Sequence, residues 1–437
     1  MKRHRPGSAL SKSPKTALVQ IEKPIYGGAF LARNEGKATF VPLTLPGEQA
    51  RIRIIEDKKS YATGEPEDIV SSSSARVGPR CPHFGACGGC SYQHATYEAQ
   101  VALKEQILRE TLQRGGVSPP DRIHVLSADP WAYRNRIRLA FDAHGRIGYR
   151  SRRSHDIVPI KECPIAAPSL VRTAFSAAEI LASSQPVFRP FELSLFCNAE
   201  ESSILASVFI HGASTAGFES FVAAWKERVP ELAGIECVQL SNADEMPKQL
   251  ARWGDDSIVY LAAGHDYRVD HGGFFQVNRW LLDEFVQRVI ADHQGKLAWD
   301  LYAGVGLFAR QLAERFEEVV AVESAPVARQ ALAQNLQGST GRGLSSDTLS
   351  FLQAPRSASN PDLIVLDPPR AGLGPEITTL LGDISAPKVV YVSCDPSTLA
   401  RDLKALLADG YSIAFITLAD LFPQTFHLET VVTLQKF

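Results

Sequence analysis

The 437-residue chain lacks the features that would place it in a membrane or export it. No apolar run approaches the roughly 18 to 20 residues that a membrane-spanning helix needs. The first fifteen residues, MKRHRPGSALSKSPK, are basic but contain no apolar segment, so they do not resemble a secretory signal. We therefore expect residues 1–15 to form a disordered basic arm, and we expect the protein to be cytoplasmic.

The chain also has little excess charge and few cysteines. Its formal net charge is -2, so no global field draws it to nucleic acid, and any basic surface must be local. Its seven cysteines are odd in number and clustered, and no export signal precedes them. This usage indicates a reducing compartment, in which a cysteine cluster binds metal more often than it forms disulfides.

Strand-like runs and turn residues divide the chain into three parts after the arm. Residues 16–74 contain about five β-rich runs broken by glycine turns, which is typical of a small closed barrel of the OB type. Residues 75–265 hold the cysteine-rich stretch, one helical pattern and several hairpin-like runs. Residues 266–437 alternate strands with helices, which predicts a parallel, doubly wound Rossmann-like sheet. The predicted fold class is therefore α/β plus β.

A glycine turn opens the α/β part. GVGLFA at 304–309 follows a strand and begins a helix, and Gly304 and Gly306 let the backbone turn sharply beside a ligand. Glu323 ends the next strand, where its carboxylate can accept ribose hydroxyls. This pattern fits NAD as well as S-adenosylmethionine. An NAD-dependent oxidoreductase therefore remains an alternative at this point.

The DPPR segment favours a methyltransferase over a dehydrogenase. Asp367 follows the apolar strand LIVL, so it lies at the carboxyl edge of the sheet, where such folds bind ligands. The two prolines after it stiffen the loop and remove two N–H donors. Amino-group methyltransferases carry a similar loop followed by an aromatic residue, but here Arg370 stands in that place, which counts against methylation of an amino group.

Two residues suggest nucleophilic chemistry. Cys394 ends the strand KVVYVS just before a helix led by Asp395, and a thiol at a helix N-terminus is expected to have a lowered pKa. An inert buried cysteine is the alternative. Glu429 enters the apolar run TVVTL, where a carboxylate needs either a partner or a catalytic task.

Taken together, these motifs resemble the RNA uracil carbon-5 methyltransferases. The resemblance covers nearly the whole chain and is closest to the bacterial 23S ribosomal RNA branch, which begins with a TRAM domain, an OB-type barrel. The matching segments are CPHFGACGGC, FFQVN at 274–278, DLYAGVG at 300–306, VVAVE at 319–323, LDPPRAGL at 366–373, YVSCDPSTLARD at 391–402 and FPQTFHLE at 422–429.

The resemblance implies roles for these residues. Cys394 would add to carbon 6 of a uracil, and Glu429 would remove the proton from carbon 5 after methyl transfer. The residues implied to bind S-adenosylmethionine are Gln276, Tyr302, Glu323, Asp347 and Asp367, with Gly304 and Gly306. The sequence departs from the family pattern at Leu307, Asp395 and Gln424, which bears on how donor and substrate are positioned.

The cysteine-rich stretch predicts a metal site. It supplies Cys81, Cys87 and Cys90, and Cys163 is the expected fourth ligand because proline follows it, as it follows Cys81. Four thiolates suit zinc or a [4Fe–4S] cluster, and the lone distant ligand together with the resemblance favours iron–sulfur in a structural role. A zinc site completed by His83 or His94 is the alternative. Two further cysteines, Cys197 and Cys237, lie in apolar runs and are expected in the core.

Basic residues between 134 and 161 predict an RNA-binding surface. These are Arg134, Arg136, Arg138, Arg146, Arg150, Arg152, Arg153 and Lys161, with Trp131, Tyr133 and Tyr149 interleaved as stacking surfaces. The target uridine should be flipped or unpaired. We expect a monomer that acts on 23S ribosomal RNA. Transfer RNA is the nearest alternative substrate, and a non-catalytic RNA-binding or assembly factor is a further alternative.

Overall fold

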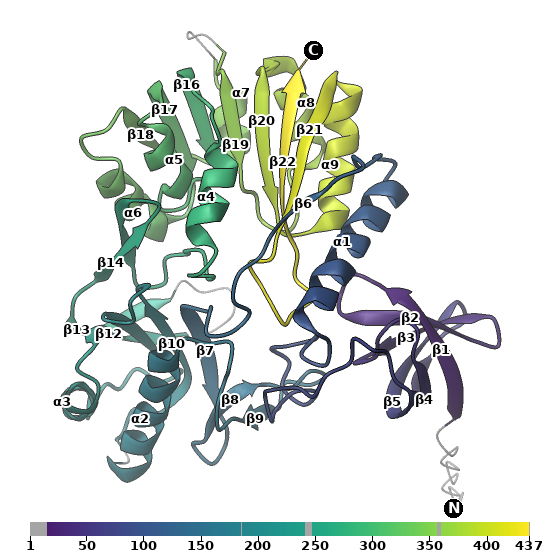
Figure 1. Ribbon diagram of the computed structural model, residues 1–437. Coiled ribbons are helices and arrows are strands. Elements are labelled where there is room, and N and C mark those ends of the chain that lie inside the picture. The colour runs from purple at the N-terminus through teal and green to yellow at the C-terminus, as the bar shows by residue number, and fades with distance from the viewer. Residues whose placement is uncertain (1–14, 185, 241–246, 356–359, 437) are drawn as a thin grey trace, which may run out of the picture.

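The computed structural model describes residues 15–184, 186–240, 247–355 and 360–436. Figure 1 shows a barrel at the lower right, a β-rich part at the lower left and an α/β part above them. The predicted basic arm lies, apart from Lys15, outside the described residues.

The first part is a closed barrel with the strand order β1-β2-β3-β5-β4. Its strands are β1 (Thr16–Pro24), β2 (Ala29–Asn34), β3 (Lys37–Pro42), β4 (Gln49–Asp57) and β5 (Tyr61–Ser71). Inward-facing side chains such as Val19, Phe30 and Ile52 are almost fully buried. The barrel predicted in residues 16–74 is therefore confirmed.

Helix α1 (Tyr97–Arg114) joins the barrel to the α/β part. It begins at Thr96, whose hydroxyl accepts the N–H of Ala99 at 3.3 Å as an N-cap. The helix then packs against α9 (Pro396–Ala408), burying Ile107 and Leu108 in the core beneath one face of the C-terminal sheet.

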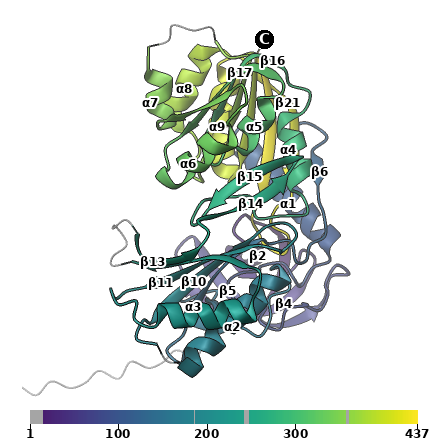
Figure 2. The same cartoon turned by 90° about the vertical axis from the view of Figure 1, so that its left-hand side faces the viewer.

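The β-rich part is a mixed sheet of order β13-β12-β11-β10-β7-β8-β9, with α2 and α3 packed against one face (Figure 2). Its elements are β7 (Arg136–Phe141), β8 (Ile147–Arg150), β9 (Ile157–Pro159), α2 (Pro168–Ser184), β10 (Pro190–Cys197), β11 (Ile204–Ile210), α3 (Phe218–Arg228), β12 (Leu232–Gln239) and β13 (Lys248–Gly254). Cys197 and Cys237 lie fully buried in this core, as expected.

The C-terminal sheet has the order β18-β17-β16-β19-β20-β22-β21-β6. Its strands are β16 (Gly295–Leu301), β17 (Phe316–Glu323), β18 (Gly341–Ser345), β19 (Leu363–Leu366), β20 (Lys388–Ser393), β21 (Tyr411–Ala419), β22 (Glu429–Lys436) and β6 (His124–Leu126). Strands β16 to β20 are parallel, and β22 runs antiparallel to both of its neighbours. The edge strand β6 comes from the middle of the chain and pairs in parallel with β21.

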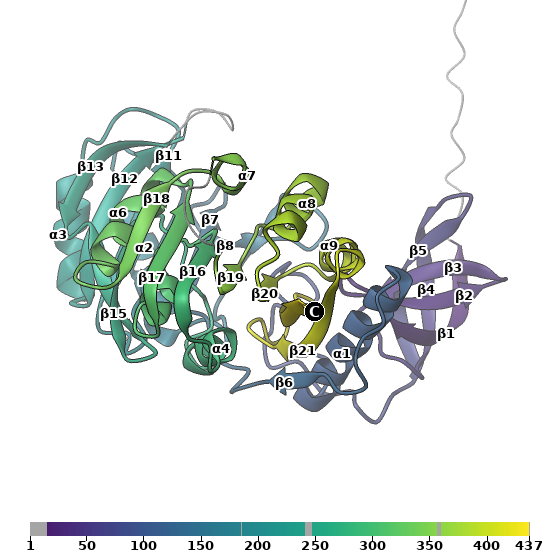
Figure 3. The same cartoon turned by 90° about the horizontal axis from the view of Figure 1, so that it is seen from above.

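Helices cover both faces of this sheet, as Figure 3 shows from above. They are α4 (Leu282–Ile290), α5 (Leu307–Leu312), α6 (Pro326–Asn335), α7 (Thr348–Gln353), α8 (Gly374–Ile384) and α9. Neighbouring residues of β16 serve opposite cores: Ala298 packs with α4 and α5, whereas Leu297 and Trp299 pack with α8 and α9. The doubly wound sheet is therefore confirmed.

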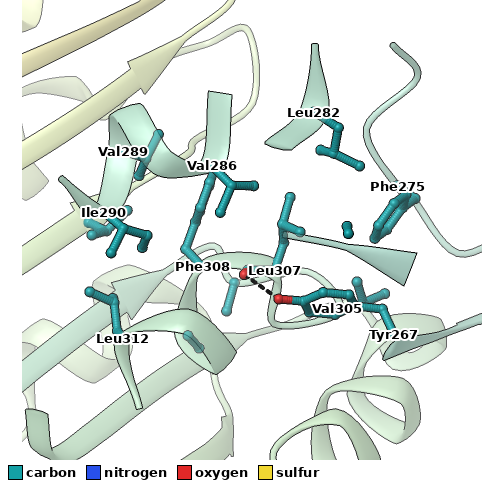
Figure 4. Close-up of a cluster of buried hydrophobic side chains, with 14 of the residues drawn as sticks. Tyr267, Phe275, Leu282, Val286, Val289, Ile290, Val305, Leu307, Phe308 and Leu312 are labelled. Atoms are coloured by element: carbon teal, nitrogen blue, oxygen red, sulfur yellow. Dashed lines mark hydrogen bonds between the residues drawn. The ribbon is translucent and has the colours of Figure 1, made fainter. Parts of the chain in front are cut away.

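A hairpin of β14 (Ser257–Ala262) and β15 (His265–Asp270) packs against α6. The hydroxyl of Tyr267 donates to the carbonyl of Leu307 at 3.0 Å, inside the apolar cluster drawn in Figure 4. The hairpin thus contacts the first residue of α5. The predicted division between 265 and 266 falls at the start of its second strand.

Candidate active site

The site lies at the carboxyl edge of the C-terminal sheet, where the strand order reverses. Strand β16 has β17 on one side and β19 on the other, so the loops after β16 and β19 diverge and leave a crevice. The residues that end β16, β17, β19 and β20, together with the first residue of the antiparallel β22, meet at this edge.

The two glycines of the turn after β16 have different tasks. Both have positive φ, +56° at Gly304 and +88° at Gly306. A Cβ on Gly306 would lie 2.8 Å from Cδ1 of Leu332, so this glycine lets α5 pack against α6. A Cβ on Gly304 would enter open space. Gly304 therefore keeps a surface free beside the turn, as a bound donor would require.

The free surface belongs to a small cavity of about 40 Å³. Four of the residues predicted to bind the methyl donor line this cavity together: Gln276, Tyr302, Gly304 and Asp367. Tyr302 has φ of +65°, a conformation that costs energy in a non-glycine residue and is common at functional sites.

Glu323 and Asp347 border this region in different ways. The Glu323 carboxylate accepts the N–H of Gly304 at 2.8 Å and that of Ala325 at 2.5 Å, which fixes it beside the glycine turn. Asp347 is the exposed N-cap of α7, where it accepts the N–H of Ser350 at 2.8 Å. It does not line the cavity.

Asp300 is a polar residue that sequence reasoning did not single out. It is fully buried at the end of β16, and its carboxylate accepts the N–H of Ala309 at 2.8 Å. Burial raises the pKa of Asp300, the hydrogen bond from Ala309 opposes the increase and the charges of Asp367 and Glu323 add to it, for a net pKa of about 8. An acid inside the otherwise apolar strand KLAWDL was the available signal.

Cys394 and Glu429 lie on adjacent strands at the same edge. Cys394 directly follows β20, and Glu429 is the first residue of β22. The two strands pair through Ser393 and Thr430, which places the thiol next to the carboxylate. Glu429 is buried, and burial together with the charge of Asp367 raises its pKa well above the ordinary value, while Arg370 opposes the shift.

The expected low pKa of the nucleophile is wrong. Burial raises the pKa of Cys394, Glu429 and Asp367 add to the increase and Arg370 opposes it, for a net pKa of about 11. Asp395 does cap α9 by accepting two backbone N–H groups, as the helix-start pattern suggested. Desolvation and two nearby acids outweigh the partial positive charge of the helix end.

Arg370 is a basic group whose charge acts on both Cys394 and Glu429. Its guanidinium lies 3.3 Å from Nδ1 of His427, and its carbonyl accepts the hydroxyl of Thr398 at 3.1 Å. Burial and the charge of Arg370 lower the pKa of His427 to about 4, so His427 is neutral at physiological pH. Arg370 therefore supplies positive charge at the edge that carries the thiol.

The predicted metal ligands line one separate cavity of about 300 Å³. Cys81, Cys87, Cys90 and Cys163 all face it. Three of the sulfurs accept hydrogen bonds. Cys87 accepts the N–H of Gly89 at 3.4 Å, Cys90 accepts the side-chain amide of Gln93 at 3.2 Å, and Cys163 accepts the hydroxyl of Tyr149 at 3.7 Å. Among the described residues, no three His, Cys, Asp or Glu side chains form a metal-ion site.

The histidines considered for a zinc site have other partners. His83 lines the cavity, but its Nε2 accepts the N–H of Lys161 at 2.9 Å. His94 is buried among Phe30 and Phe84, with Nε2 3.0 Å from the carbonyl of Thr44. Neither arrangement favours a role as a ligand.

The cysteine cavity adjoins the loop that leads to Glu429. Thr425 and His427 of that loop line the cavity opposite the cysteines. The carbonyl of Gln424 accepts the N–H groups of Ser91 and Tyr92, which follow the last cysteine of the stretch. In Figure 1 this yellow loop descends from the upper sheet beside α1. The cysteine-rich stretch thus holds the loop that carries the candidate base.

Five arginines of the predicted RNA-binding surface share three carboxylates, so the surface keeps an excess of positive charge. The ion pairs are Arg138 and Arg150 with Glu192, Arg146 with Asp142, and Arg152 and Arg153 with Glu65 of the barrel. Arg136 is held over the ring of Phe196. Tyr133 is fully buried, and the hydroxyl of Tyr149 contacts Cys163. Neither ring therefore presents the free stacking surface that was predicted for it.

None of the helices that the structure describes is both long and apolar enough to span a membrane.

Comparisons with known proteins point to one family. The family model described as tRNA (Uracil-5-)-methyltransferase matches residues 357–437, and the TRAM domain model matches residues 13–66. A 23S rRNA (uracil(1939)-C(5))-methyltransferase RlmD of Pectobacterium carotovorum is 34% identical over 92% of this chain and 90% of its own. An uncharacterized RNA methyltransferase of Thermotoga maritima is 31% identical over 96% and 98%.

A solved structure agrees with these relatives. The tRNA (uracil-54, C5)-methyltransferase of Pyrococcus abyssi, in complex with S-adenosyl-L-homocysteine, superposes with a TM-score of 0.77 at 25% identity. The match covers 95% of this chain and 99% of the other. The similarity therefore includes the barrel, the middle part and the C-terminal sheet.

Proposed function

The chain belongs to the RNA uracil-5-methyltransferase family, and on that premise we propose that it methylates carbon 5 of a uridine in 23S ribosomal RNA, with Cys394 as nucleophile and Glu429 as base. The protein is an enzyme that transfers a methyl group from S-adenosylmethionine to RNA. The observation that supports the assigned residues is the pairing of β20 with β22, which brings Cys394 and Glu429 to the same edge of the sheet.

The proposed reaction begins at Cys394. Its thiolate forms a bond to carbon 6 of the uracil, and the electron pair of the 5,6 double bond moves to the carbonyl oxygen to give an enolate. Carbon 5 would then form a bond to the donor's methyl carbon as the methyl–sulfur bond breaks, its electron pair staying on the sulfur, which becomes neutral. Glu429 removes the remaining proton from carbon 5, and the electrons restore the double bond and expel the thiolate. Arg370 offsets negative charge while the thiolate and the enolate exist.

The residues present fit a bound S-adenosylmethionine, which supplies a methyl group activated by the positive sulfur. Gly304 leaves open space beside the turn, and Glu323 offers carboxylate oxygens next to it. Gln276, Tyr302 and Asp367 form the wall of the small cavity there. We propose that these residues hold the donor, with Asp347 near its adenine.

Ribosomal RNA is favoured over transfer RNA by the relatives. Several proteins named as 23S rRNA uracil methyltransferases are 32% to 34% identical over at least nine tenths of this chain. Transfer RNA is the second candidate, because the P. abyssi enzyme named for tRNA has the same three-part architecture. We further propose that the enzyme is a cytoplasmic monomer with a barrel at 16–74, a central region at 75–265 and a methyltransferase domain at 266–437.

We propose that the cysteine cavity holds a [4Fe–4S] cluster bound by Cys81, Cys87, Cys90 and Cys163. Four thiols border one space of about 300 Å³, and hydrogen-bond donors point at three of the sulfurs, as they do around iron–sulfur clusters. The lone distant ligand Cys163 favours the cluster over a single zinc, because structural zinc sites usually take their ligands in close pairs. The role of the cluster would be structural, fixing the stretch that holds the loop before Glu429.

Methyl transfer to defined RNAs tests the function. The protein is incubated with methyl-labelled S-adenosylmethionine and either a 23S ribosomal RNA transcript or a transfer RNA pool. Nuclease digestion and mass spectrometry should find 5-methyluridine in the ribosomal transcript. Label confined to transfer RNA would reverse the substrate assignment. Label on carbon 5 of neither RNA would contradict the proposed function.

A further inference from the structure

The barrel touches the catalytic edge through the turn between β1 and β2. Gly27 and Gly28 in this turn have φ of +103° and +86°, which glycine adopts without strain. A Cβ on Gly28 would lie 3.1 Å from the ring of Phe426 and 3.3 Å from Oγ of Ser91. A side chain at this position would crowd these neighbours and strain the positive φ, so glycine favours the close approach of the barrel to the loop before Glu429.

Tyr26, directly before these glycines, reaches the nucleophile. Its hydroxyl donates to the backbone carbonyl of Cys394 at 3.2 Å, although 368 positions separate the two residues. Its ring meets the ring of Phe426 edge-on, with 5.9 Å between centroids. Phe426 in turn packs on His427 at 4.3 Å, and His427 lies against Arg370. Tyr26 is therefore part of the wall around the thiol.

The carbonyl of Cys394 lies at a break in the regular hydrogen bonding. The ladder between β20 and β22 ends at Ser393, which pairs with Thr430. The first turn of α9 begins two residues after Ser393, where the carbonyl of Asp395 accepts the N–H of Leu399 at 3.1 Å. The peptide that carries the nucleophile thus lies between a strand and a helix. The hydroxyl of Tyr26 supplies a donor at that point.

The hydroxyl remains a neutral donor across the working pH range. Burial raises the pKa of Tyr26, and the negative charge of Asp395 raises it further, with Arg370 opposing. The turn itself is anchored, because Lys23 at the end of β1 forms a 2.5 Å ion pair with Glu110 on α1. The barrel is therefore held to the helix that packs against α9.

We infer that Tyr26 is a positioning residue for Cys394 and that the barrel completes the active site. The inference rests on the proposed function of Cys394 as nucleophile. Its mechanical content is specific: the hydroxyl of Tyr26 fixes the orientation of the peptide that aims the thiol at carbon 6. A barrel displaced from the edge would leave this peptide free to rotate.

The test compares Tyr26→Phe with Tyr61→Phe. The first substitution removes the hydroxyl but keeps the ring against Phe426. The second removes a hydroxyl from the same barrel, on β5, away from the C-terminal loop. Loss of one hydrogen bond that orients the nucleophile should lower kcat about 3- to 10-fold. The KM values for RNA and for the methyl donor should stay within about twofold of wild type. The melting temperature should stay within about 2 °C of wild type. Tyr61→Phe should match wild type throughout.

Two results would overturn the inference. One is an unchanged kcat in Tyr26→Phe. The other is a change carried by the KM for RNA alone, which would make Tyr26 an RNA-binding residue.

A second measurement needs no methylation activity. Iodoacetamide labelling of Cys394, followed by peptide mass spectrometry without RNA, should be at least about threefold faster in Tyr26→Phe, because a mobile turn exposes the half-buried thiol. Labelling of the fully buried Cys197 is the internal reference. Failure of wild type to methylate RNA would refute the proposed function. An unchanged labelling rate would then refute the positioning role separately.

Discussion

A buried ion pair between α1 and the loop after β21 should be among the strongest single contacts between the parts. Nζ of Lys104 lies 2.5 Å from Oδ1 of Asp420 and 2.9 Å from the carbonyl of Phe422. The side chains are 0% and 1% exposed. Burial lowers the pKa of Lys104, and the carboxylate partly restores it. Lys104→Met keeps most of the volume but leaves the acid buried without its cation.

The expected loss is about 3 to 5 kcal/mol of unfolding free energy, because an uncompensated buried charge remains. Lys23→Met is the matched control, since Lys23 also pairs at 2.5 Å with an acid on α1 but its side chain is 42% exposed. That exposed pair should be worth at most about 1 kcal/mol. Urea unfolding of both variants measures the difference.

The double variant Lys104→Met with Asp420→Leu completes the cycle. Removing both charges should recover most of the lost stability, since apolar replacements of buried ion pairs are often neutral. A loss below about 1 kcal/mol for Lys104→Met, or equal losses for the two lysine variants, would refute this reasoning.

Three further predictions follow from the sites. Because the pKa of Cys394 is raised to about 11, the rate of its alkylation by iodoacetamide should increase about tenfold per pH unit below that value. Arg370→Ala should move this pH profile to still higher pH, because Arg370 lowers the pKa of the thiol. Movement to lower pH would contradict that effect of Arg370. Protein purified without oxygen should be brown with about four irons per chain, and Cys163→Ser should lose this iron whereas Cys237→Ser, in the core, should keep it; zinc without visible absorption would contradict the cluster. Gly304→Val should weaken donor binding at least about tenfold in calorimetry, because the side chain would occupy the open space and strain a positive φ, and unchanged affinity would exclude the assigned surface.

Much of the architecture was accessible from local sequence patterns. The alternation of strands and helices and the turn GVG predicted the doubly wound sheet and the position of Gly304, because these features depend on neighbours along the chain. The parallel strands of this sheet are joined by helical crossovers, which the alternation of strands and helices also indicates. The position of Cys394 at a strand end was likewise local, whereas the joint roles of Cys394 and Glu429 came from the family resemblance.

The remaining features depend on contacts between distant segments. The three-residue strand β6 joins the C-terminal sheet by pairing with β21, and so short a run carries little signal. The pairing of Arg152 with Glu65 needs the packing of the central part on the barrel. The approach of Tyr26 to Cys394 likewise spans nearly the whole chain. The pKa of the thiol was misjudged because the helix start is visible in sequence and burial is not.

The order of chemical steps gives the most direct test of the central claim. Glu429→Gln leaves the addition of Cys394 and methyl transfer possible but removes the base, and loss of a general base costs a factor of about 100 to 10,000 in rate. Methylated RNA should therefore remain bonded to Cys394 on denaturing gels and carry label from the methyl donor, whereas Cys394→Ala should give neither bond nor label. Normal turnover by Glu429→Gln, or trapped RNA without a methyl group, would contradict the assignment of Glu429.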